Sequence, residues 1–196
     1  MPTLIDRLAP HATWKNAALA LGVLLVSNLA MGRYILPNIE AKHPEALDDG
    51  FLVMTDLEPL RSPEEVHRIF DLYTPDILGS VWLLYALDFV TPLAFAVGLF
   101  CLMGKMLRYL EVKAGLWRMV LLLPFAGLLF DYAENVFSLF LIGQYQDGHV
   151  LPTLARVAGV ATAVKFLCLA STGLALVALL TRTAMRFIAR KMGRSR

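Results

Sequence analysis

Four long apolar segments constrain the fold of this chain more than any other feature of its sequence. A bilayer core about 30 Å thick is crossed by about 20 apolar residues of helix. Four stretches of the 196-residue chain reach that length, at residues 17–36, 77–104, 119–145 and 152–181. The sequence therefore predicts an all-α membrane protein, a bundle of four transmembrane helices that forms one polytopic membrane domain over residues 1–196.

The composition supports this class and excludes others. The chain is 58% hydrophobic and 17% charged, whereas soluble domains contain about 45–50% apolar and about 25% charged residues. Its net charge of only +2 is too small for a disordered chain or a nucleic-acid-binding protein. We therefore expect membrane lipid, and no nucleic acid, among its partners.

Basic residues gather on one side of the predicted spans. Most of the 18 lie in the N-terminal tail, in the connection at 105–118 and in the tail at 182–196, whereas the acidic segment 37–76 holds only three. The positive-inside rule then predicts cytoplasmic N- and C-termini and an outer loop at 37–76, in a bacterial-type plasma (inner) membrane. A cleaved signal peptide is the alternative for the first span, but the span is long for one and the residues around Ala30 form a poor cleavage site.

The outer loop is long enough to need structure of its own. Ser62, Pro63 and Glu65 are typical of a capping box at the start of a helix. The apolar face of this amphipathic helix then recurs at helical spacing. We interpret the helix either as a shield over the end of the bundle or as a lid or gate above a site, formed by Val66, Ile69, Phe70 and Tyr73.

The sequence contains no motif typical of a metal site, a reactive thiol pair or a cofactor site. His43, His67 and His149 share the outer side but show no metal-ligand spacing. Cys101 and Cys168 lie inside spans without a CxxC partner, as expected for helix packing. We predict no metal and no cofactor.

Four ionisable residues interrupt the predicted spans, and each costs at least about 2.5–3.5 kcal/mol near the bilayer centre. They are Asp88, Asp131, Glu134 and Lys165. Counted from the outer ends of their spans at 1.5 Å per residue, all four lie about 16–21 Å deep. Three helices therefore bring charge to one layer near the midplane.

Polar and small residues share a helix face with these charges, which predicts that the faces meet inside the bundle. Pro92 cannot donate to the carbonyl of Asp88, so we expect a kink there and a carbonyl open to another partner. The predicted ligand or proton site comprises Asp88, Asp131, Glu134, Asn135, Lys165, Asn28 and Tyr85.

The charges suit three classes of function. Three carboxylates and one ammonium carry −2 if all are ionised, which favours a site that binds or passes a proton, a cation or a small polar or lipid-headgroup ligand. One alternative is a membrane-embedded acid–base enzyme acting on a lipid, with Glu134 or Asp131 as acid or base and Lys165 as charge stabiliser. Another is a structural or assembly factor whose charges only fix helix packing. Four helices form a narrow bundle, so a transporter would need a homo-oligomer.

Overall fold

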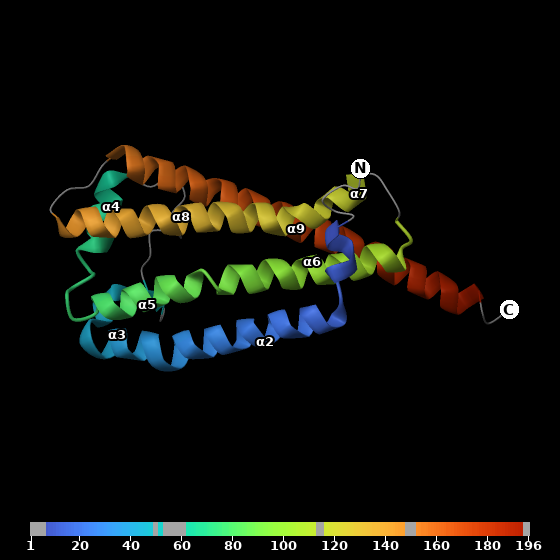
Figure 1. The fold of residues 1–196 in the computed structure, drawn as a ribbon, viewed down its shortest axis with the longest axis horizontal. Coiled ribbons are helices and arrows are strands. Elements are labelled where there is room, and N and C mark those ends of the chain that lie inside the picture. Colours follow the sequence, from blue (N-terminus) through green and yellow to red (C-terminus); the bar gives the residue numbers. More distant parts are fainter. Residues whose placement is uncertain (1–6, 49–50, 53–61, 113–115, 148–151, 194–196) are drawn as a thin grey trace.

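The computed structural model describes residues 7–48, 51–52, 62–112, 116–147 and 152–193. It contains four helical stretches long and apolar enough to cross a membrane: Trp14–Lys42, Leu78–Tyr109, Trp117–Gln146 and Pro152–Met192. They run side by side along the long axis of the molecule (Figure 1). The prediction of a helical protein with four apolar spans is therefore confirmed, and each helix is longer than predicted.

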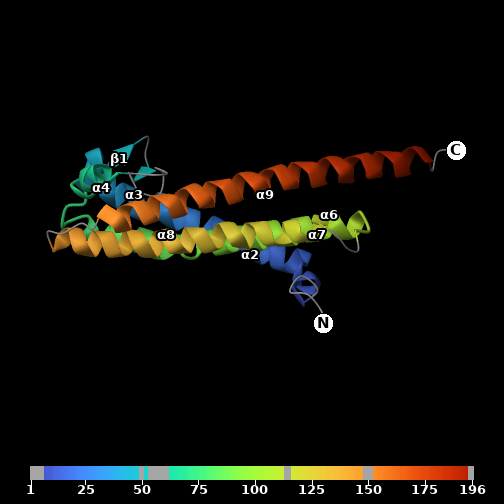
Figure 2. The same ribbon diagram turned by 90° about the horizontal axis from the view of Figure 1, so that it is seen from above.

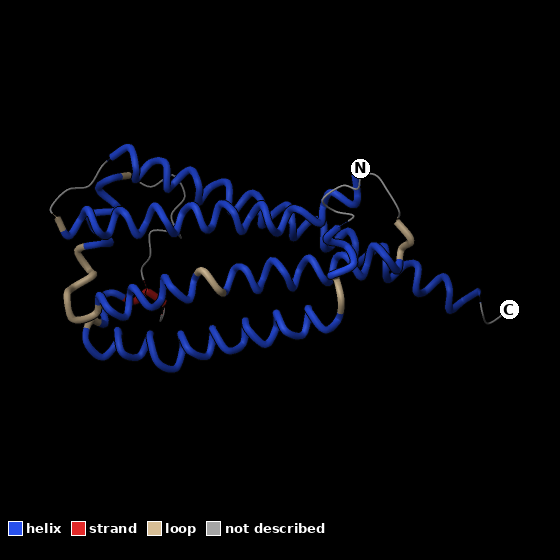
Figure 3. Tube along the Cα trace, in the orientation of Figure 1, coloured by secondary structure: helices blue, strands red, loops and turns tan. Residues whose placement is uncertain are grey.

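The first two stretches are each interrupted once. Helix α2 (Trp14–Ala30) begins at the Thr13 cap and passes through a π-helical turn at Met31–Ile35 into α3 (Leu36–Lys42). Two residues, Phe89 and Val90, separate helix α5 (Leu78–Asp88) from helix α6 (Thr91–Tyr109). Figure 3 shows this interruption as a loop within the helix. Pro92 lies in the first turn of α6, where its missing N–H is tolerated, so the expected kink is a complete break.

The last two stretches carry the longest helices. Helix α7 (Leu116–Met119) passes through a 3₁₀ turn at Val120–Leu122 into α8 (Leu123–Gln146). Helix α9 (Pro152–Gly193) continues well beyond the predicted boundary at residue 181. Neither proline nor glycine occurs between Gly173 and Gly193, so nothing in the backbone stops the helix where the basic residues begin.

The small elements lie at the two ends of the helices. At one end, called the loop end, lie α3, a 3₁₀ turn at Pro44–Ala46, strands β1 (Leu47–Asp48) and β2 (Phe51–Leu52), and α4 (Pro63–Phe70). The strands pair antiparallel. The opposite end, called the tail end, carries the 3₁₀ turn Ala9–His11 and the end of α9 (Figure 2).

Helix α4 begins as the sequence predicts. The Ser62 hydroxyl accepts from the backbone N–H of Glu65 at 3.2 Å, and the Glu65 carboxylate accepts from the N–H of Ser62 at 2.5 Å. This reciprocal capping box satisfies two N–H groups that the helix itself leaves unpaired.

The helices pack around two apolar clusters, one at each end. Helix α8 packs chiefly against α9, and α2 chiefly against α6. Large apolar side chains also point away from the molecule, and Leu129, Leu167 and Leu174 are more than 60% exposed. Such faces are typical of helices that contact lipid.

Aromatic and basic side chains pair at the tail end. Lys105 lies over the Trp14 ring at 5.6 Å, and Arg182 lies over the Trp117 ring at 4.6 Å. Arg190 lies 5.1 Å from the centre of the Tyr109 ring. We call these side chains the tail-end belt, and amphipathic rings beside cations are typical of a membrane–water interface.

Candidate functional site

Lys165 of α9 forms ion pairs with two carboxylates of α8. Its Nζ lies 2.7 Å from Oε2 of Glu134 and 3.3 Å from Oδ1 of Asp131. The three residues are buried, with Glu134 completely inaccessible. Of the four predicted charges, Lys165, Asp131 and Glu134 are therefore in contact, and they join α8 to α9.

Thr162, one turn before Lys165 on α9, extends this cluster. Its hydroxyl donates to Oε1 of Glu134 and also lies 3.1 Å from the carbonyl of Ala158. A hydroxyl has only one proton to donate, and a carbonyl oxygen can only accept. When Glu134 is ionised, the Thr162 hydroxyl donates to it; when Glu134 is protonated, its carboxyl donates to Thr162 and the Thr162 proton goes to the Ala158 carbonyl. The arrangement therefore accommodates Glu134 in either protonation state.

The break between α5 and α6 is held by side chains of α8. Asn135 donates from Nδ2 to the Asp88 carboxylate at 2.8 Å and, at 3.4 Å, to the Asp88 carbonyl. The Tyr132 hydroxyl donates to the carbonyl of Phe89 at 2.5 Å. The carbonyl that Pro92 leaves open thus finds its partner on a neighbouring helix, as predicted.

Polar faces of α8 and α9 meet as the helical spacing predicts. The small and polar face of α8 is buried, and Gly127 brings the helix close to α9, since a Cβ there would lie 3.6 Å from the Cβ of Cys168. On α9 the matching buried residues are Ala158, Thr162, Lys165 and Thr172. Oδ2 of Asp131 and Oδ1 of Asn135 are buried and have no hydrogen-bond partner within the described ranges.

A cavity of about 330 Å³ borders the cluster. All four long helices contribute to it, and its charged lining residues are Asp131 and Lys165. Asn28 and Thr91 are further polar residues of its wall, and most of the remaining wall is apolar. The cavity can therefore receive a small molecule that is apolar over most of its surface and polar at one end.

Two of the predicted site residues lie apart from the charges. Asn28 is exposed and its side-chain amide donates to the carbonyl of Leu24, in its own helix, at 2.8 Å. It reaches the site only as part of the cavity wall. Tyr85 is fully buried in the loop-end apolar cluster and does not line this cavity.

The predicted gate residues are packed into the loop end. Val66, Ile69, Phe70 and Tyr73 are all buried there, in the apolar cluster that also contains Tyr85. Val66, Ile69 and Phe70 belong to α4, which contacts α8 and α9, whereas Tyr73 lies three residues beyond the end of α4 and so outside the observed helix. The structure thus places the helix as a cover over this end of the molecule, and a gating role stays a prediction.

Tyr132 is a contributor to the site that sequence reasoning did not identify. The available signal was the proline-induced break in the second span, which leaves carbonyls in need of donors. Tyr132 precedes Asn135 by one helical turn, and both residues reach the same break. A second donor near Asn135 was therefore identifiable from the spacing alone.

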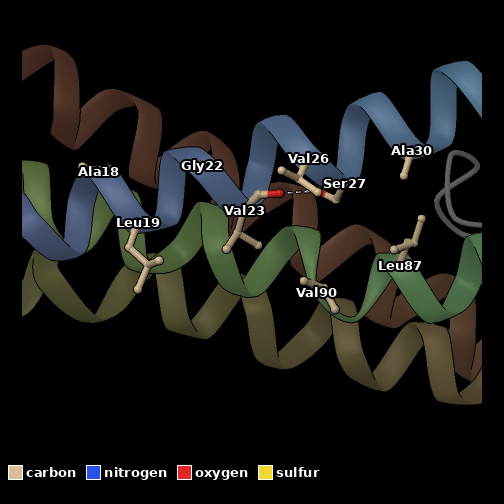
Figure 4. A pocket seen from close by; sticks show the side chains of 9 residues that line it. All are labelled: Ala18, Leu19, Gly22, Val23, Val26, Ser27, Ala30, Leu87 and Val90. Atoms are coloured by element: carbon tan, nitrogen blue, oxygen red, sulfur yellow. Dashed lines mark hydrogen bonds between the residues drawn. The ribbon is translucent and has the colours of Figure 1, made fainter.

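A larger cavity, of about 490 Å³, lies between α2 and the α5–α6 junction (Figure 4). The described residues that line it are almost entirely apolar, and the one hydroxyl among them, on Ser27, donates to the carbonyl of Val23 at 3.0 Å. It therefore offers no charged or open polar group to a ligand.

Among the described residues, no group of histidine, cysteine and acidic side chains has the arrangement of a metal site. No family model, curated protein or solved structure matches the chain. Its function is therefore inferred from its own residues.

Proposed function

We propose that this chain is a polytopic integral membrane protein whose four long helices form a bundle around an intramembrane site for a proton, a cation or a small ligand with a polar head. The excess of basic residues at the tail end supports a cytoplasmic location for that end and an outer location for the loop end, in a bacterial-type plasma membrane. The bundle forms one domain.

The tail-end belt supports this placement in the bilayer. Toward the tail end, the first charges after Asp88 and Lys165 are Lys105 and Arg182, each about 25 Å along its span. On the third span, Arg118 lies about 20–24 Å from Asp131 and Glu134. Toward the loop end, Asp76 and Arg156 lie only about 14–18 Å from Asp88 and Lys165, whereas Asp147 lies about 20–24 Å from the two carboxylates of the third span. The layer is therefore deep in the membrane, and on the second and fourth spans it is closer to the outer surface than to the cytoplasm.

The observation that carries the proposal is that the 330 Å³ cavity ends on Asp131 and Lys165. Lys165 already contacts two carboxylates of α8. The carboxylate of Asp88, on α5, is bound by the Asn135 amide, which also belongs to α8. One ammonium among three carboxyl groups leaves a negative excess, which protons or a cationic ligand can neutralise. We infer that the site prefers a positively charged or proton-donating group.

The walls of the cavity set the shape of that ligand. Leu24, Phe95, Leu99, Leu128 and Leu169 supply an apolar surface. An amphiphile with a short apolar body and an amine head would place its head beside Asp131 and its body along these side chains. A lipid with a cationic headgroup meets the same requirement.

Dodecylamine and dodecanol provide a matched pair of probes for this site. We expect dodecylamine to raise the apparent melting temperature of the protein in nanodiscs more than dodecanol does. The Asp131→Asn variant should lose that difference. The Asp147→Asn variant, which removes an exposed carboxylate at the end of α8, should keep it. Equal effects of the two probes on the unmodified protein would contradict a preference for cations.

Proton passage is tested separately with the same variants. Proteoliposomes that contain a pH-sensitive dye report proton entry when a potassium gradient sets the membrane potential. Entry that depends on Asp131 or Glu134 would show that the site passes protons. Entry equal to that of protein-free liposomes would restrict the site to binding.

A purely structural role is the second candidate, because the Lys165 ion pairs join α8 to α9. In that case the cluster fixes the register of two helices, and the cavity is incidental. A fully neutral cluster, described in the Discussion, separates the two roles.

A further inference from the structure

A separate cavity at the tail end is lined by two arginines. It measures about 270 Å³ and lies between α6, α7 and the turn that contains Ala9. Arg108 comes from α6 and Arg118 from α7, while Gly104, Leu107 and Leu121 contribute to the rest of its wall. The described residues that line it include no carboxylate. A cavity with this lining favours an anion.

The donors of Arg108 suit such a ligand. Within the part of the chain that the structure describes, the hydrogen bond of its side chain is a long one, from Nε to the carbonyl of Gly104 at 3.4 Å. A guanidinium has five N–H donors in a planar fork, so four remain on its two terminal nitrogens. Glu111, a nearby acid, instead contacts Arg186 at 2.6 Å and Arg190 at 3.1 Å.

The position of the cavity indicates a lipid as the source of the anion. Arg118 is next to Trp117 of the tail-end belt, where the uncharged part of the third span ends. Leu107 and Leu121 on the cavity wall are buried in the apolar cluster of this end. The cavity thus combines cations at headgroup level with apolar side chains, and basic recesses between helices suit anionic headgroups.

We propose that this cavity binds the phosphate group of an anionic phospholipid, with Arg108 and Arg118 as the two recognising residues. This inference relies on the membrane placement proposed above and is independent of the ligand site at Lys165. Failure of either proposal is therefore distinguishable, because the variants and the probes differ.

The test measures phosphatidylglycerol retained by the purified protein. Native mass spectrometry after release from nanodiscs that contain phosphatidylglycerol and phosphatidylcholine gives the ratio of the two bound lipids. We expect the Arg108→Gln/Arg118→Gln variant to bind phosphatidylglycerol roughly tenfold more weakly or worse, since it removes both cations that line the cavity. The Arg186→Gln/Arg190→Gln variant removes the same charge at the same end, outside the cavity, and should retain the lipid.

Three outcomes would overturn the proposal. The first is unchanged lipid retention in the Arg108→Gln/Arg118→Gln variant, and the second is an equal loss in the control, which would show nonspecific attraction to the basic end. The third is displacement of the lipid by millimolar inorganic phosphate, which would assign the cavity to a soluble anion. If the double variant fails to fold, the Arg118→Lys variant is measured instead. This substitution keeps the positive charge but removes the planar guanidinium, so we expect the variant to bind the lipid more weakly than the unmodified protein.

Discussion

Replacement of Lys165 by methionine tests the charge cluster directly. The substitution keeps a long side chain but removes the ammonium that contacts Asp131 and Glu134. Loss of one partner from a buried ion pair costs about 3–5 kcal/mol, because the remaining charge stays buried without compensation. In a chain of 196 residues, each kcal/mol shifts the melting temperature by about 2–4 °C. We therefore expect a decrease of roughly 6–20 °C.

A fully neutral cluster should recover most of this loss. The triple variant Lys165→Met/Asp131→Asn/Glu134→Gln has similar side-chain volumes and no buried charge, and neutral replacement of a whole ion-pair network is often tolerated. The measurement is the apparent melting temperature in nanodiscs of one lipid composition. Lys105→Met is the control, since it removes a lysine that lies over the Trp14 ring at the tail end, and its loss should stay below about 2 kcal/mol.

Two results would refute this reasoning. A Lys165→Met protein that melts within about 2 °C of the unmodified protein would show that the cluster does not depend on the ammonium. A triple variant that melts as low as the single variant would show that packing, rather than charge, causes the loss. If the triple variant folds and no longer distinguishes dodecylamine from dodecanol, the cluster has a binding role beyond its effect on packing.

Three further predictions concern the break in the second span and the loop end. Asn135→Leu should cost about 1–3 kcal/mol, because Asp88 loses its amide partner, and an unchanged melting temperature would contradict the role of that contact. Ser62→Ala should cost about 1 kcal/mol and speed hydrogen exchange in α4, whereas unchanged exchange would show that the cap does not hold the helix. The Thr74 hydroxyl bond lowers the pKa of Asp76, so the carboxylate contributes stability above its unfolded-state pKa and loses it as pH falls through the lower folded value. Thr74→Val should raise the pKa of Asp76 toward its ordinary range in a carbon-13 NMR titration, and an unmoved titration would exclude this cause.

The charge layer was predictable because the number of residues along each span gives both the depth of a side chain in the membrane and the helix face on which it lies. Asp131 and Glu134 are three residues apart on one helix, so their side chains share a face, and Lys165 lies at matching depth on another helix. The Asp88 carbonyl was predictable for a different reason, since proline always lacks the N–H that would bind it.

Residue spacing did not predict which residues of the first span face the interior of the protein. Ser27 is buried and the adjacent Asn28 is exposed, a rotation of about 100° on a helix. Because Ser27 and Asn28 are adjacent in a stretch of α2 that is otherwise apolar, the sequence shows no single polar face that would fix that rotation. Similarly, the first charge of the tail marks where a membrane can end, whereas the α9 helix continues past that charge at least to Gly193, because no proline or glycine interrupts it before that residue.

Because α9 is one continuous helix, a small tilt at one point produces a larger displacement at its far end. From Lys165 to Met192 the helix extends about 40 Å as one rigid rod. A tilt of about 10° around Lys165 would therefore move the far end by about 7 Å. Such a movement exceeds the reach of the ion pairs that Arg186 and Arg190 form with Glu111. A small rearrangement among the buried carboxylates would thus be amplified into the release of a contact at the tail end.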